Sequence, residues 1–264
     1  MTALKIEGAA LVTGAGKRLG AAMALYLAGR GHDVAVHYAS SAQDAEDVAA
    51  QVRAMGRNAV AVQADLLDDA QTETLVERAA GALGPLAVLV NNASIFEYDT
   101  LATATRDSWD RHMQSNLRAP FLLTQAFAAQ APATRTDAND EPLASGLVIN
   151  MVDQRVRKLT PEFMTYTIAK MGLWAFTQTA AQALAPQIRV NAIGPGPTLR
   201  GGRQSEEHFA KQRAATLLQR GADPDGICAA LGYFLDAPAI TGQLLCVDGG
   251  QHLAWETPDV VGVE

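Results

Sequence analysis

The sequence predicts one α/β domain in which helices cover both faces of a seven-stranded parallel sheet. Two observations lead to this prediction. Seven short runs rich in valine, isoleucine and leucine show almost no polar alternation, which is typical of strands buried on both faces. Longer amphipathic stretches separate these runs, and such strand–helix alternation builds a doubly wound sheet. The 264 residues suit a single domain of this class, expected to span 1–264.

The expected elements follow one another without a linker or an internal repeat. Strands are expected at 9–13, 33–38, 58–63, 86–91, 146–151, 188–193 and 243–248. Helices are expected at 19–30, 42–55, 70–83, 107–130, 163–185 and 223–236. The polar stretch 131–145 is predicted to be a surface loop. The Gly- and Pro-rich stretch 194–208 is predicted to be either a mobile lid or a plain connecting loop, within a substrate-loop region at 194–222.

Composition narrows the range of partners. The net charge is −7 and no Lys/Arg run stands out, which argues against nucleic acid. No segment approaches the ~20 apolar residues that a membrane helix needs. Cys228 and Cys246 stand in apolar contexts and form neither a redox motif nor a metal-ligand cluster. We expect a cytoplasmic protein without a metal.

A glycine-rich turn joins the first strand to the first helix. The stretch "LVTGAGKRLG" at 11–20 has glycines at 14, 16 and 20. These glycines allow a tight turn whose backbone N–H groups face a pyrophosphate at the helix N-terminus. The strand–turn–helix context therefore predicts a dinucleotide site, although a purely structural turn is the alternative.

The end of the second strand indicates which dinucleotide binds. A site for NAD usually has an acid there, but positions 37–41 are His, Tyr, Ala, Ser and Ser. Lys17 and Arg18 in the glycine turn could neutralise a 2′-phosphate. NADPH is therefore favoured over NADH, unless these two cations are only solvated surface charges.

Other polar residues follow later strands. Asp65 could accept a hydrogen bond from the adenine amino group, and the small residues at 91–96 would let the backbone pass close to the cofactor. Asn116 lies in the long helix expected at 107–130. Its amide could be a satisfied buried group, or it could hold a water for a proton relay.

Tyr166 and Lys170 lie four residues apart on an expected helix and therefore share a face. Tyrosine has an ordinary pKa near 10, and a neighbouring lysine cation would lower that pKa by favouring the phenolate. The spacing thus predicts a proton-transfer pair.

Together these motifs resemble the short-chain dehydrogenase/reductase family over nearly the whole chain. The matching stretches are "TGAGKRLG", "ADLLD", "NNAS", "SN" at 115–116, Tyr166-x-x-x-Lys170, "RVNAIGPGPT" and "TGQLLCVDGG". The resemblance implies a Rossmann-type domain, a homotetramer or dimer, Tyr166 as proton donor, Lys170 as ligand of the nicotinamide ribose, and Asn116 as support for a water relay. The implied cofactor contacts are Gly14, Lys17, Arg18, Leu19, His37, Tyr38, Ser40, Ser41, Asp65, Leu66, Asn92, Ala93, Ser94, Tyr166, Lys170, Pro195, Gly196 and Thr198.

Two departures from the family pattern resemble its pteridine reductase branch. Arg18 replaces the middle glycine of the turn, and Asp153 replaces the serine that pairs with the tyrosine. Phe96, just after the "NNAS" stretch, matches the aromatic residue that sandwiches the pterin ring against the nicotinamide in that branch, where the arginine reaches both phosphates and substrate. The implied substrate contacts are Arg18, Ser94, Phe96, Asp153 and Tyr166.

The chemistry of Asp153 suits a nitrogen heterocycle. A carboxylate accepts from pterin N–H groups, and a buried carboxyl with a raised pKa can deliver a proton to a reduced C=N nitrogen. The leading hypothesis is an NADPH-dependent reductase of pterins or dihydropteridines such as dihydrobiopterin, dihydromonapterin or dihydrofolate. A carbonyl or ketoacyl reductase and a non-catalytic NADPH-binding redox sensor are the alternatives. Asp153 could also be only a helix cap, and Phe96 only a core residue.

Overall fold

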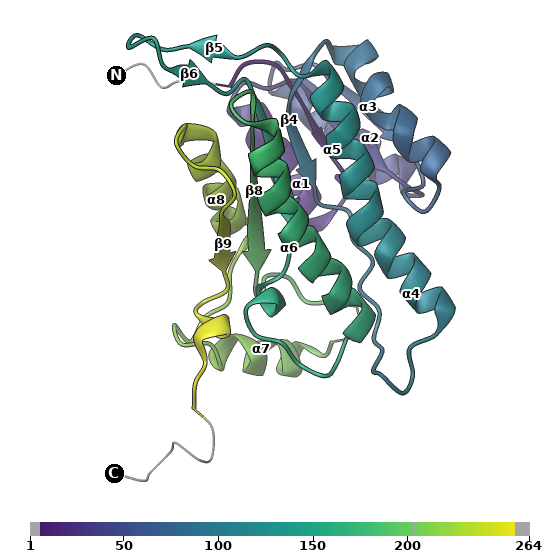
Figure 1. The fold of residues 1–264 in the computed structure, drawn as a ribbon. Helices are drawn as coiled ribbons and strands as arrows, with labels where there is room; N and C mark the ends of the chain where they lie inside the picture. Colours follow the sequence, from purple (N-terminus) through teal and green to yellow (C-terminus); the bar gives the residue numbers. More distant parts are fainter. Residues whose placement is uncertain (1–5, 203, 257–264) are drawn as a thin grey trace.

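The seven expected strands form one parallel sheet. The computed structural model describes residues 6–202 and 204–256, and the strand order is β3-β2-β1-β4-β7-β8-β9 (Figure 1). Each strand lies within two residues of its expected bounds, so the predicted sheet is confirmed. The strands are β1 (Ala9–Val12), β2 (Val34–Tyr38), β3 (Ala59–Gln63), β4 (Leu86–Asn91), β7 (Gly146–Met151), β8 (Ile188–Pro195) and β9 (Leu244–Val247).

Helices cover both faces of this sheet (Figure 1). One face is covered by α1 (Arg18–Gly29), α2 (Ala42–Ala54) and α8 (Pro224–Asp236). The other is covered by α3 (Asp69–Leu83), α5 (Ala119–Gln130) and α6 (Met164–Leu184). Every residue of β1, β4 and β7 is buried, which explains why their sequences lack polar alternation. The result is a single Rossmann-like α/β domain.

The long helix expected at 107–130 is interrupted. It begins as α4 (Arg106–Met113), widens into a π-helical turn over Gln114–Arg118 and continues as α5. Pro120 has no backbone N–H for the carbonyl of Asn116, so α-helical pairing cannot run through this point. The π turn places Asn116 in the interior with none of its surface exposed.

The stretch 131–145 is not a plain loop. It contains an antiparallel hairpin of β5 (Arg135–Thr136) and β6 (Pro142–Leu143). The Asp137 carboxylate closes the turn by accepting from the N–H groups of Asn139 (2.7 Å) and Glu141 (2.9 Å). This local capping was not visible in the apolar pattern, because the segment buries almost nothing.

The helix α7 (Glu206–Ala214) lies within the predicted substrate-loop region and was not expected from the sequence. It has no buried residue, so its sequence carries no apolar stripe. α7 crosses the carboxyl ends of the strands, at the end of the sheet opposite the β5–β6 hairpin (Figure 1). Among the described residues, no helix is long and apolar enough to cross a membrane.

Candidate active site

The glycine turn follows β1 at the carboxyl end of the sheet. The chain passes from β1 to a strand on one side and from β4 to a strand on the other side, so the strand order reverses at this point. Gly14 has a φ of +61°, and a Cβ there would lie 3.1 Å from the Cα of Ala93. A Cβ on Gly20 would lie 2.2 Å from the carbonyl oxygen of Gly14. The turn therefore tolerates only glycine at these positions, and its exposed backbone at the start of α1 fits a pyrophosphate.

The side chain of His37 is bonded to the backbone of the glycine turn and does not face a ligand. Its ring is buried, Nδ1 accepts from the Gly14 N–H (2.9 Å) and Nε2 bonds the carbonyl of Ala64 (3.0 Å). Both ring nitrogens are thus engaged. The expected contact between the His37 side chain and the cofactor is therefore revised to a positioning role. Burial lowers the pKa of His37 to about 4, so the ring is neutral at pH 7.

The two cations of the turn are both engaged. Lys17 forms an exposed ion pair with Asp44 (2.8 Å), an acid that sequence reasoning did not consider. Arg18 adopts a φ of +55°, the left-handed conformation that favours glycine. Its guanidinium donates to the carbonyls of Leu199 (3.1 Å) and Arg200 (2.9 Å). Arg18 therefore ties the substrate-loop region to the glycine turn.

The residues expected around the adenosine end gather at the carboxyl ends of β2 and β3. Ser40 is exposed, while Tyr38 and Ser41 are half-buried. Asp65 is exposed and accepts from the N–H of Leu67 (3.0 Å), whereas Leu66 is buried. The side chain of Leu66 therefore packs inward, and only its backbone remains for a ligand.

The chain segment after β4 borders the other side of the glycine turn. The hydroxyl of Thr13 accepts from the N–H groups of Asn92 and Ala93, both at 2.9 Å. The Asn92 amide donates to the carbonyl of Thr13 at 2.8 Å. Ser94 is exposed beside this segment. These bonds fix the backbone that the sequence placed along the cofactor.

Asp153, Tyr166 and Lys170 come together as expected. The Tyr166 hydroxyl donates to Asp153 Oδ2 at 2.8 Å, and Asp153 Oδ1 accepts from the Arg155 N–H at 2.8 Å. The Lys170 ammonium donates to the carbonyl of Met151 at 2.7 Å and lies 5.7 Å from the centre of the Tyr166 ring. Asp153 does cap a short 3-10 turn, and the same carboxylate also accepts from the tyrosine. The cap is therefore observed, and the catalytic role of Asp153 stays a prediction.

The pKa of Tyr166 shifts in the direction opposite to the one expected from the sequence. Burial raises the pKa of Tyr166 well above its ordinary value, and the neighbouring Asp153 carboxylate raises it further. The expected lowering of the Tyr166 pKa by Lys170 is therefore wrong. Burial also raises the pKa of Asp153, and it lowers the pKa of Lys170 to about 8. The tyrosine is protonated and serves as the hydrogen-bond donor.

Asn116 is a satisfied buried amide. Its Oδ1 accepts from the Ile95 N–H (2.9 Å) and its Nδ2 donates to the Ile95 carbonyl (2.8 Å). The side chain therefore holds the segment that carries Phe96, and the expected role of Asn116 in a water relay stays a prediction. The sequence could not distinguish these readings, because the partner lies 21 residues away.

Phe96 is not a core residue, since 47% of it is exposed. It stacks on Phe163 with ring centres 4.3 Å apart and presents an edge contact to Tyr166 at 4.7 Å. Phe163 has a φ of +55° at the start of α6 and carries the Arg155 guanidinium 4.8 Å from its ring centre. Sequence reasoning missed Phe163 and Arg155, because nothing in the local pattern marks them.

A cavity of about 800 Å³ opens beside this cluster at the carboxyl ends of the strands. Its walls combine the glycine turn, the aromatic stack and the substrate-loop region. Among the residues that line it are Arg18, Phe96, Asp153, Phe163, Thr198 and Phe209. Pro195 and Gly196 also line it, and a Cβ on Gly196 would collide with Asp248. The volume is in the range of small-molecule sites.

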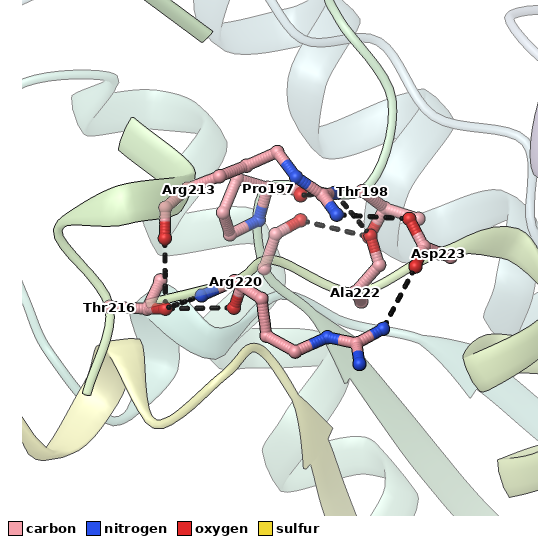
Figure 2. Close-up of polar contacts among 8 residues, drawn as sticks. Pro197, Thr198, Arg213, Thr216, Arg220, Ala222 and Asp223 are labelled. Atoms are coloured by element: carbon pink, nitrogen blue, oxygen red, sulfur yellow. Dashed lines mark hydrogen bonds and ion pairs between the residues drawn. The ribbon is translucent and has the colours of Figure 1, made fainter. Parts of the chain in front are cut away.

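Polar bonds anchor α7 over this cavity. Figure 2 shows Arg213 donating to the carbonyls of Pro197 (3.0 Å) and Ala222 (2.6 Å) and to the carboxylate of Asp223 (3.0 Å). The Thr216 hydroxyl closes the following turn by donating to the Arg220 carbonyl at 2.8 Å. Since α7 has no buried residue, the bonds of Arg213 tie the end of this helix to the segment that follows β8.

The glycine turn lies where the strand order reverses, next to the buried Tyr166 and Lys170. These features define a nucleotide-dependent oxidoreductase with a doubly wound sheet. Residues 14–252 match the family model described as Enoyl-(Acyl carrier protein) reductase. The chain belongs to this family, within the short-chain dehydrogenases/reductases.

Known relatives refine this assignment. The crystal structure of FolM alternative dihydrofolate reductase 1 from Brucella suis, in complex with NADP, superposes with a TM-score of 0.90 at 42% identity, covering 98% of this chain and 100% of that one. The Brucella canis protein, also with NADP, gives 0.90 at 41%, covering 99% and 100%. The 3-oxoacyl-[acyl-carrier-protein] reductase FabG of Staphylococcus aureus is 31% identical over 95% of this chain and 100% of its own. The chain is an NADP-dependent short-chain oxidoreductase, which confirms the predicted cofactor.

Proposed function

We propose that this chain reduces dihydropteridines, such as dihydrobiopterin, dihydromonapterin or dihydrofolate, to their tetrahydro forms. The observation that carries the proposal is the half-buried Asp153 carboxyl bonded to the Tyr166 hydroxyl at 2.8 Å. The family position of Asp153 is usually a serine hydroxyl, which serves a carbonyl oxygen. Similarity to FolM dihydrofolate reductases supports the same substrate class.

NADPH, when bound, supplies a hydride to the C=N bond, and the nitrogen then requires a proton. Burial raises the pKa of Asp153, which favours the protonated carboxyl as the donor of that proton. Tyr166 bonds the same carboxyl and can pass a proton to it, and a proton from water then restores the tyrosine. When ionised, Asp153 instead accepts from a ring N–H of the substrate. Lys170 is assigned to the cofactor ribose and Asn116 to positioning of the segment that carries Phe96.

The substrate ring is assigned to the cavity beside Phe96. The stack of Phe96 on Phe163 fixes the plane of the Phe96 ring in the cavity wall, and an aromatic ligand in the cavity can pack against this pair of rings. Arg18 and Ser94 complete the proposed substrate contacts, and the region 194–222, with Phe209 on α7, forms the outer wall.

A ketoacyl reductase is the second candidate, because FabG proteins are among the relatives. The two functions differ in what they require at position 153. Asp153→Asn keeps the shape and the bond from the Arg155 N–H but cannot carry a proton. Asp153→Ser restores the hydroxyl of the wider family.

We expect both variants to bind NADPH normally and to lose most dihydropteridine reduction, on the order of 10²-fold or more for a lost proton donor. The assay follows NADPH oxidation with a dihydropteridine and with a small ketone, and Asp110→Asn on the exposed face of α4 is the matched control. Parent-like pterin turnover by Asp153→Asn, or faster parent turnover of ketones than of pterins, would contradict the proposal.

A homotetramer in the cytoplasm completes the proposal. Large apolar side chains are exposed on the helices of one sheet face, among them Trp109 on α4, Phe121 on α5 and Met171 on α6. Such a surface is typical of a contact between subunits. Two free cysteines suit a reducing compartment. Light scattering after gel filtration tests the assembly, and a monomeric mass would contradict it.

A further inference from the structure

Arg155 is a cation in the cavity wall that has no acidic partner. It lies in the 3-10 turn Gln154–Val156 directly after β7, and its side chain is half-buried. Its Nη1 donates to the Thr160 hydroxyl at 2.6 Å. Within 6–202 and 204–256, no carboxylate lies within ion-pair distance of its guanidinium. Part of its charge is therefore withdrawn from water without being neutralised.

Two phenylalanine rings link the Arg155 side chain to Tyr166. Its backbone N–H holds Asp153, while its guanidinium packs 4.8 Å from the centre of the Phe163 ring. Phe163 also stacks on Phe96, which in turn contacts Tyr166 with ring centres 4.7 Å apart. A chain of ring contacts through Phe163 and Phe96 thus leads from Arg155 to Tyr166. A substrate ring beside Phe96 would meet the cation only through a side chain that extends beyond the ring.

Two other charged side chains that line the cavity, Arg18 and Glu162, already have hydrogen-bond partners. Arg18 is bonded to two loop carbonyls. Glu162, an acid of the same rim, accepts from the Tyr98 hydroxyl at 3.4 Å. The cavity of about 800 Å³ is near the upper end of small-molecule sites, which leaves room for a substituent on a bicyclic ring.

We propose that Arg155 is a specificity-determining residue that favours dihydropteridines with an anionic side chain, such as the carboxylates of a folate tail, over dihydropteridines with a neutral one. The inference rests on the proposed function. A guanidinium presents a planar fork of donors that matches a carboxylate, and partial burial strengthens this bond relative to one in water. The charge of Arg155 also lowers the pKa of the Asp153 carboxyl, an effect that every dihydropteridine shares, so the contact with an anionic side chain is measured by the difference between two substrates.

The test compares Arg155→Gln with the parent on dihydrofolate and on dihydrobiopterin, which has an uncharged side chain. We expect KM for dihydrofolate to rise roughly tenfold, as for one lost charge-assisted bond, while any change in kcat that acts through Asp153 should be the same for both substrates. KM for dihydrobiopterin should stay within about twofold, since no ion pair is lost. Arg155→Lys keeps the charge and should retain most of the preference for dihydrofolate.

Two further variants control the experiment. Arg157→Gln removes an exposed cation two residues away, which packs on Trp174 outside the cavity, and should change neither substrate. Glu162→Gln removes the acid of the rim and should lower KM for dihydrofolate alone. Added salt should weaken dihydrofolate binding in the parent more than in Arg155→Gln.

The outcomes separate the two claims. Equal losses on both substrates would show that Arg155 only supports the aromatic stack, and no change on either would show a solvated surface charge. Both results would overturn this inference while parent turnover of dihydrobiopterin still supports the proposed function. A parent that turns over neither dihydropteridine would contradict the proposed function and this inference together.

Discussion

The buried ring of His37 makes the free energy of unfolding depend on pH between 6.5 and about 4, where an exposed histidine would have little effect. Its pKa falls from 6.5 in an ordinary setting to about 4 in the folded chain, because burial disfavours the imidazolium. Between these values the unfolded chain binds a proton that the folded chain excludes. The stability contributed by neutral His37 is therefore complete above pH 6.5 and is lost as the pH falls toward 4.

The size of this loss follows from the two pKa values. Since one pKa unit corresponds to about 1.4 kcal/mol, His37 should lower the free energy of unfolding by about 2 kcal/mol at pH 5 and by about 3 kcal/mol at pH 4. Protonation at Nδ1 would also break the bond from the Gly14 N–H, so the glycine turn should lose its support in the same range. NADPH affinity should decline together with stability.

The assay is urea unfolding of the parent and of His37→Gln from pH 7.5 to pH 4.5. Carboxylates titrate in both proteins, so the difference between their unfolding free energies isolates His37. That difference should shrink by about 2 kcal/mol between pH 7.5 and pH 5. An NMR titration of the His37 ring in the parent, which should stay neutral at pH 5, does not depend on the variant folding well. A difference that stays constant within about 0.5 kcal/mol, or an NMR pKa near 6.5, would refute the reasoning.

Other variants test the remaining parts of the site. Tyr166→Phe should retain NADPH affinity and reduce kcat by about 10²–10⁴-fold, because a general acid is lost; unchanged kcat would place the proton donor elsewhere. Phe96→Ala should raise KM for a dihydropteridine several-fold while the melting temperature barely moves, since 47% of the side chain is exposed; a large drop in melting temperature at constant KM would indicate a core role. Arg18→Gly should relieve about 1–2 kcal/mol of strain from the left-handed backbone and cost about 0.5–1 kcal/mol through the added entropy of the unfolded chain. The melting temperature should therefore not fall, while KM for the substrate should rise; a lower melting temperature would contradict this. Because the pKa of Lys170 is lowered to about 8, NADPH affinity measured by fluorescence should weaken above pH 8, and Lys170→Met should remove this dependence; a flat profile in the parent would show that the cation is not required.

Distant contacts decided several roles that the sequence left open or assigned differently. The side chains of Asn116 and His37, which the sequence placed at the active site, each bond to a backbone segment far away in the chain. Lys17 was assigned to a phosphate but pairs with Asp44. Each outcome depends on which groups folding brings within bonding distance, and local sequence does not encode this.

The sequence by itself determined the sheet and the helices that cover it. Their positions follow from local apolar periodicity, the glycine turn follows from spacing, and Tyr166 and Lys170 share a helix face by geometry alone. Only the tertiary structure decided the electrostatics and the shape of the cavity. Burial beside Asp153 raises the pKa of Tyr166 instead of lowering it, and Phe163 reaches Phe96 from 67 positions along the chain. Solvent exclusion and side-chain stacking are properties of the packed interior, so no pattern along the chain could reveal them.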